Sequence, residues 1–220
     1  MPRQVRYIIP KIAHHTMQRG NNRQQIFFNS KDKQYFCQNL KKYSKEYKVY
    51  IGAYCLMDNH LHLLVYPDSK EGMIKFMKSI SQYHTQYINR QYKRSGKLWE
   101  NRYKMYLVDP DYEWTVARYI ELNPVRANMV NDPTGYQYSS ARNHLKDDKD
   151  DKINKDIIEG RKKDYRGFIE EGIKEKEIKQ IRDVLQQGKI FGTEEFIDKI
   201  EKKLKITLKV RGRGRPVKIK

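Results

Sequence analysis

The chain has 220 residues, with 46 Lys and Arg against 27 Asp and Glu, and a formal net charge of +19 at pH 7. This excess of positive charge favours a polyanionic partner, nucleic acid first of all, because binding releases the counterions condensed on the partner. No apolar stretch approaches the roughly 18 residues of a membrane-spanning helix and residues 1–4 do not begin a signal peptide, so we expect a cytoplasmic, nucleoid-associated protein without membrane contacts.

The first part of the chain alternates predicted strands and helices. Apolar residues at every second position predict strands, and apolar residues at three-to-four spacing predict helices. In chain order these are a strand over 12–19, a helix capped by Ser30, strands over 49–57 and 61–66, a helix over 70–92, a strand over 98–108 and a helix from Asp111 to Asn123. This order is typical of an α+β, ferredoxin-like fold, in which helices cover one face of an antiparallel sheet.

The composition changes near residue 145. Sixteen of the 17 tyrosines precede His144, and the segment 146–152 is charged throughout, as expected of an exposed linker. We therefore predict one domain over 1–144 and a small helical extension over 145–208, with helices over 174–187 and from Thr193. Both parts carry a positive net charge, so both are candidates to contact the same polyanion.

A basic tail follows over 209–220 and holds no acidic residue. Its run Arg213-Gly214-Arg215-Pro216 resembles the core of an AT-hook, which binds the narrow minor groove of A/T-rich duplex DNA. The alternative is a cationic tail that is attracted to any phosphate backbone.

His60 and His62 stand one residue apart at the start of an apolar strand. Side chains alternate faces along a strand, so both histidines point to the same side. Two imidazoles on one face can share a divalent metal ion, although an isolated pair of this kind is more often an ordinary polar pair. His14, His15 and His84 show no clear role and are interpreted as structural.

Tyr119 and Asn123 lie four residues apart on the last predicted helix of the first part, and therefore on one helix face. Cleavage of a phosphodiester by covalent catalysis requires a nucleophile and a group that absorbs charge on the phosphate oxygens. Tyr119 would supply the nucleophile, and His60, His62 and the amide oxygen of Asn123 would hold one Mg²⁺ or Mn²⁺ ion. Taken alone, Tyr119 and Asn123 also fit ordinary solvent-facing residues.

Four motifs resemble those of a known family. The run YCLMDNHLHLL at 54–64 resembles the histidine-hydrophobic-histidine (HUH) signature of single-tyrosine transposases. Three further runs resemble the REP-associated tyrosine transposases, namely HTMQRGN at 15–21, LWENRYK at 98–104 and RYIELNPVRA at 118–127.

The resemblance covers about residues 5–144 and implies a ferredoxin-like fold, a catalytic tyrosine at Tyr119 and metal ligands at His60, His62 and Asn123. It further implies nicking of single-stranded DNA beside a hairpin, with a 5′-phosphotyrosine, a free 3′-OH and strand transfer, by a monomer or a homodimer. Two residues depart from the family's pattern: Asp58 replaces a common proline, and Asn123 replaces a frequent glutamine whose longer side chain holds metal more readily.

Basic residues that flank the motifs are candidate DNA contacts, namely Arg19, Arg23, Arg102, Lys104 and Arg126, together with Arg213 and Arg215 in the tail. A solvated charged face is the alternative for each of them. Two other functions also fit the sequence: a hairpin-binding protein that has lost cleavage, and an RNA-binding ferredoxin-like module. The RNA-binding module would place aromatic residues on its strands but would need no histidine pair.

Overall fold

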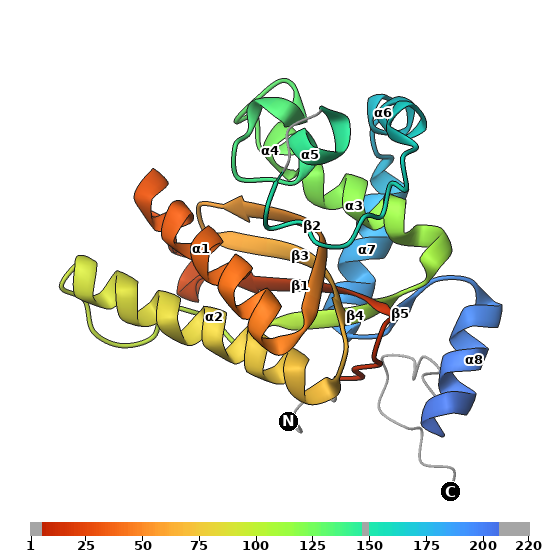
Figure 1. The fold of residues 1–220 in the computed structure, drawn as a ribbon, viewed down its shortest axis with the longest axis horizontal. Helices are drawn as coiled ribbons and strands as arrows, with labels where there is room; N and C mark the ends of the chain where they lie inside the picture. The colour runs from red at the N-terminus through yellow and green to blue at the C-terminus, as the bar shows by residue number, and fades with distance from the viewer. Residues whose placement is uncertain (1–5, 147–149, 207–220) are drawn as a thin grey trace, which may run out of the picture.

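The computed structural model describes residues 6–146 and 150–206, which form an α+β fold around a five-stranded sheet of order β2-β3-β1-β4-β5 (Figure 1). The sheet consists of β2 (Val49–Met57), β3 (His60–Pro67), β1 (Ala13–Arg19), β4 (Lys104–Val108) and β5 (Ile190–Phe191). The first four strands pair in antiparallel fashion, and the short β5 pairs with β4 in parallel. The predicted fold class is confirmed, with β5 as an additional strand.

Helices lie on both faces of the sheet rather than on one. On β1, Gln18 accepts a hydrogen bond from Ser81 of α2 (Lys70–Gln91), which packs beside α1 (Ser30–Tyr47). The neighbouring residues Met17 and Arg19 point the opposite way, into a pocket that α3 (Glu113–Glu121) and α7 (Glu175–Gln187) also line. The sequence predicted these helices but not the face that each of them covers.

Local signals explain where the long helices begin. Asn29, and not Ser30 as predicted, caps α1: its side chain accepts from the backbone of Lys31 and Asp32, and Asp32 in turn accepts from the backbone of Asn29. Ser69 caps α2 by accepting from the backbone of Gly72. These caps satisfy backbone N–H groups that have no partner within the helix.

Two predicted elements are shorter than expected. The strand predicted over 98–108 begins only at Lys104, and before it Trp99 forms an isolated bridge to Gly20. The helix predicted from Asp111 divides into a 3₁₀ turn (Pro110–Tyr112), α3, and the short α4 (Asn123–Arg126). Pro124 stands in the first turn of α4, where a missing backbone N–H costs little.

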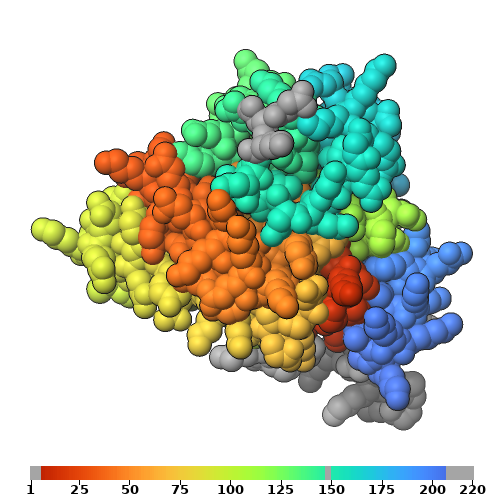
Figure 2. Space-filling model, viewed as in Figure 1, coloured from red at the N-terminus to blue at the C-terminus, as the bar shows by residue number. Residues whose placement is uncertain are grey.

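The extension packs against the residues that precede it, as the teal and blue surfaces of Figure 2 show. It contains α6 (Lys162–Glu170), α7, β5 and α8 (Glu194–Leu204), after the short α5 (Ala141–Leu145). Tyr165 of α6 and Ile181 of α7 are fully buried in the same hydrophobic cluster as the sheet residues. Among the described residues, no helix combines the length and apolar composition that crossing a bilayer requires.

Within the predicted exposed linker over 146–152, Asp151 is exposed as expected, whereas Asp150 and Lys152 are only partly exposed. Asp150 accepts a hydrogen bond from the Tyr54 hydroxyl of β2 at 2.5 Å and forms an ion pair with Lys152 at 2.6 Å. Lys41 of α1 forms an ion pair with Asp151. These contacts fasten the start of the extension to α1 and β2.

Two buried histidines away from the α3 side make stability depend on pH. Burial lowers the pKa of His14 and of His84 to about 4 from the usual 6.5. Between pH 4 and pH 6.5 the unfolded chain binds more protons than the folded chain. The contribution of these histidines to the free energy of unfolding is therefore fully present above pH 6.5 and is lost as the pH falls toward 4. Each histidine should cost about 2 kcal/mol at pH 5 relative to pH 7. Urea unfolding at both pH values measures the loss, and His84→Gln should reduce it by about 2 kcal/mol. An unchanged loss in that variant would contradict the assignment.

Candidate active site

A pocket of about 580 Å³ lies where α3, α4 and α7 face the strands β1 and β3. The structure brings eight of the predicted site residues to this pocket, namely Arg19, Arg23, His60, His62, Lys104, Tyr119, Asn123 and Arg126. Among the described residues no Asp or Glu lines it. The pocket is therefore cationic and suits an anionic ligand.

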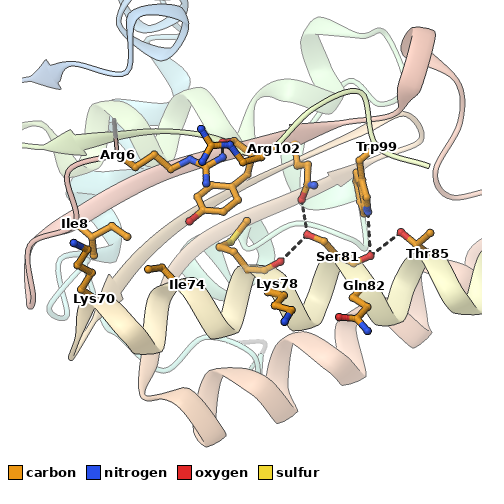
Figure 3. A pocket seen from close by; sticks show the side chains of 13 residues that line it. Arg6, Ile8, Lys70, Ile74, Lys78, Ser81, Gln82, Thr85, Trp99 and Arg102 are labelled. Carbon is orange, nitrogen blue, oxygen red and sulfur yellow. Dashed lines mark hydrogen bonds between the residues drawn. The ribbon is translucent and has the colours of Figure 1, made fainter. Parts of the chain in front are cut away.

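Three predicted DNA contacts do not join this pocket. Arg213 and Arg215 lie outside the described residues. Arg102 lines a separate groove of about 720 Å³, between α2 and the segment 99–103 (Figure 3). There the Trp99 indole donates to the carbonyl of Ser81 at 3.0 Å.

His60 and His62 both line the pocket, and their ring centroids are 5.2 Å apart at an interplanar angle of 90°. The Nδ1 atom of His60 donates to the side-chain oxygen of Asn59 at 2.6 Å, which leaves Nε2 for other partners. Asp58, the departure from the family's proline, is tied down by an ion pair with Lys33 at 2.6 Å. This ion pair anchors the turn before His60 to α1.

A chain of three side chains extends from His62 into the core. Nδ1 of His62 lies 2.8 Å from Nε2 of His15, and Nδ1 of His15 lies 2.8 Å from the hydroxyl of Tyr106. Each neutral imidazole carries one N–H, so the direction of these hydrogen bonds decides which nitrogen of His62 keeps its lone pair. His15, which the sequence left without a clear role, thus contacts one of the predicted metal ligands.

Burial keeps the histidines of the pocket neutral. It lowers the pKa of His15 to about 3 and that of His62 well below 6.5, the neighbouring rings adding to the effect at His62. Burial also lowers the pKa of His60 to about 4; the charges of Arg19 and Arg126 add to this effect, and a hydrogen bond to Asn123 opposes it. At pH 7 each ring therefore offers an unprotonated nitrogen.

Tyr119 lies beside the histidines. Its ring centroid is 5.6 Å from that of His62 and 5.9 Å from that of His15. The side chain is only 4% exposed, and the pocket that it lines gives access to it. The guanidinium carbon of Arg126 lies 4.5 Å from the centre of the Tyr119 ring, so a positive charge stands next to the phenol.

Asn123 is held in one orientation by its neighbours. Its amide nitrogen donates to the carbonyls of Tyr119 and Ile120, at 2.9 and 3.1 Å. Its amide oxygen accepts from Arg126 at 2.9 Å. A carbonyl oxygen has two lone pairs, so one remains for a second partner.

The spacing of the two histidine rings is compatible with one shared divalent ion. A ring nitrogen bound at about 2.1 Å places the ring centroid about 3.3 Å from the ion, so two bound rings have centroids about 4.6–5.4 Å apart. The 5.2 Å between His60 and His62 falls in this range. The described residues contain no group of three His, Cys, Asp or Glu that could hold a metal, so a third protein donor would have to be another group that lines the pocket, such as the amide oxygen of Asn123.

Sequence reasoning missed several residues of the pocket. Arg182, Leu185 and Gln186 reach it from α7, and His15 stands behind it on β1. The predicted helix over 174–187 gave no indication of where it docks, because helical spacing shows which face is buried but not against what. Pairing of β1 with β3 brings His15 near His62, and this pairing is not encoded in local sequence.

Comparisons with known proteins agree with the architecture. The family model described as "Transposase IS200 like" matches residues 9–123, which is more than half of the chain. No curated protein matches the chain.

Among solved structures, the chain is similar to a REP-associated tyrosine transposase bound to a REP hairpin, with 17% identity, a TM-score of 0.56, and coverage of 71% of this chain and 93% of that one. It is also similar to a putative transposase from Deinococcus radiodurans R1, with 17% identity, a TM-score of 0.39, and coverage of 55% of this chain and 96% of that one. At 17% identity the first likeness shows a shared fold. Because the family model spans most of the sheet, α3 and the histidine pair, this chain belongs to the family of IS200-like transposases.

Proposed function

We propose that this transposase cleaves and rejoins single-stranded DNA beside a hairpin, with Tyr119 as the nucleophile. The observation that carries the proposal is the position of the Tyr119 ring, 5.6 Å from the ring of His62, in a pocket whose described lining contains cations and no acid. A phosphodiester is the anionic substrate that needs this combination of a nucleophile and positive charge. The REP hairpin bound to the similar transposase supports hairpin-bearing DNA as the partner.

The proposed step is an exchange of ester bonds at phosphorus. The phenol oxygen of Tyr119 forms a bond to phosphorus while the bond from phosphorus to the 3′ oxygen breaks. The phenol loses its proton and the leaving oxygen gains one, so the products are a 5′-phosphotyrosine and a free 3′-OH. Attack by a 3′-OH on the phosphotyrosine reverses the exchange and rejoins the strand.

Arg126 and the ligand set assist this step in different ways. Arg126, next to the phenol ring, stabilises negative charge as it develops on the phenol oxygen. His60, His62 and Asn123 would hold one Mg²⁺ or Mn²⁺ ion, which supplies charge neutralisation at the phosphate oxygens. With two imidazoles and no carboxylate among these donors, we expect Mn²⁺ to bind more tightly than Mg²⁺.

A covalent adduct tests the proposal. The protein is incubated with a labelled single-stranded hairpin oligonucleotide, and label that stays on the denatured protein is measured. We expect an adduct with Mn²⁺ or Mg²⁺ and none in EDTA, with Mn²⁺ effective at the lower concentration. Tight binding of the hairpin without any adduct would instead identify a binding protein that no longer cleaves.

A further inference from the structure

Helix α7 lies outside the segment that the family model matches, which ends at residue 123. Three of its side chains nevertheless line the pocket of Tyr119, namely Arg182, Leu185 and Gln186. The extension therefore supplies part of the wall of the candidate active site. In Figure 1, α7 lies behind the sheet beside α3 and β4.

Several contacts fix α7 relative to Tyr119. Ile178, Ile181 and Leu185 are buried on one face of the helix. Arg118, the residue before Tyr119, donates to Glu177 of α7 at 3.0 Å. Immediately after α7, the strand β5 pairs with β4. These contacts hold the helix in a defined place, so the side chains that it turns toward the pocket stand at fixed positions.

Arg182 and Arg23 differ in their partners from Arg19 and Arg126, the other two arginines that line the pocket. Arg19 forms two hydrogen bonds to the carboxylate of Glu100, and Arg126 donates to Asn123 and to the carbonyl of Tyr119. Arg182 is exposed, and within residues 6–146 and 150–206 its guanidinium has neither an ion pair nor a hydrogen bond.

The charged residues that line the pocket with Arg182 are all basic. Burial is the largest cause of the lowered pKa of His62; the charges of His15, His60 and Arg126 follow, and the charge of Arg182 adds to them. Burial is also the largest cause of the lowered pKa of Arg126, to which the charge of Arg182 contributes. Arg182 stands near both groups, and none of the acidic residues that the structure describes lines the pocket between them. A bound anion in the space between an unpaired guanidinium and other positive charges would offset their mutual repulsion and accept hydrogen bonds from the guanidinium.

We propose that Arg182 binds a backbone phosphate of the single-stranded DNA, next to the phosphate that Tyr119 attacks, so that α7 completes the active site. This inference rests on the proposed function, because it requires DNA in the pocket. A guanidinium presents a planar fork of N–H donors that matches two oxygens of one phosphate. Its exposure places it at the rim, where a neighbouring phosphate of the same strand would pass.

Binding is measured in the Tyr119→Phe background, so that cleavage does not disturb the equilibrium. Arg182→Ala is expected to weaken binding of the hairpin oligonucleotide by about fivefold and to reduce the slope of log affinity against log salt by about 0.7. Arg182→Lys keeps the charge but loses the planar fork of donors, so its affinity should lie between that of the Tyr119→Phe background and that of Arg182→Ala. Lys176→Ala is the matched control, because Lys176 is exposed on the same helix, about 120° around from Arg182. It should change affinity by less than about twofold.

Neutral methylphosphonate linkages then identify the phosphate. One linkage beside the cleaved position should weaken binding to the background protein by about fivefold and leave binding to the Arg182→Ala variant unchanged. Additive losses at every linkage, or a loss for Arg182→Ala no larger than for Lys176→Ala, would overturn the role of Arg182. If the wild-type protein forms its adduct, such a result rejects the role of Arg182 alone. If the wild-type protein forms no adduct, but the neutral linkage weakens binding to the background protein and not to Arg182→Ala, the cleavage function is rejected and the contact of Arg182 with phosphate stands.

Discussion

Replacement of Tyr119 by Phe is expected to abolish the covalent adduct and to lower strand cleavage by about 10⁴-fold or more. The phenylalanine keeps the ring that contacts His62, His15 and the guanidinium of Arg126, and it removes only the oxygen that would attack phosphorus. Affinity for the hairpin oligonucleotide should stay within about twofold, because phosphate contacts come from the basic residues around the pocket. Gel separation of the denatured adduct and a binding titration measure the two quantities.

Tyr83→Phe provides the matched control, because Tyr83 is 42% exposed on α2, the helix that packs against the opposite face of the sheet. It makes the same chemical change and should leave the adduct unaltered. An adduct that persists in Tyr119→Phe would show that another tyrosine attacks the DNA. Tyr106 would then be the first alternative to examine, since its hydroxyl lies against His15.

The long elements could be predicted because their signals are local. α1 and α2 carry apolar stripes with caps at Asn29 and Ser69, and β2 and β3 are apolar runs joined by a two-residue turn. The first half of the strand predicted over 98–108 is not a strand, because contacts with distant segments determine its conformation. There Trp99 bridges to Gly20 and its indole donates to Ser81 of α2, and no local pattern reports these partners.

The candidate site could be predicted only in part. Alternation along β3 placed His60 and His62 on one face, and helical spacing placed Tyr119 and Asn123 on another single face. Neither rule says that the two faces meet, and the family resemblance supplied that expectation. The structure brings them together because α3 packs across β2 and β3.

The parts that sequence reasoning missed depend on contacts between distant segments. Arg182 reaches the pocket because α7 is held by Arg118 and because β5 adds to the edge of the sheet. The antiparallel register of β1 and β3 places Met17 opposite His62 and His15 opposite Leu64. His15 therefore comes within hydrogen-bond distance of a residue 47 positions away.

Replacement of His15 by Ala is expected to weaken Mn²⁺ binding by about 10- to 100-fold. For Nε2 of His62 to bind a cation, its Nδ1 must carry the proton and donate to Nε2 of His15, which then donates from Nδ1 to the hydroxyl of Tyr106. His15 thus fixes both the tautomer and the ring orientation of His62. Without it, the ring would be free to turn and to place its proton on the nitrogen that would bind the proposed ion.

Titration calorimetry with Mn²⁺ measures this effect without any cleavage step. The conservative variant His15→Gln retains a side-chain oxygen that can accept from Nδ1 of His62, so it should recover most of the affinity that His15→Ala loses. A role in packing alone predicts the reverse pattern: both variants lose folding stability to urea, while the metal affinity of the folded fraction stays the same. Equal and undiminished Mn²⁺ binding in both variants would show that His62 does not depend on His15 for its orientation, and that the hydrogen-bonded chain to Tyr106 serves the core rather than the site.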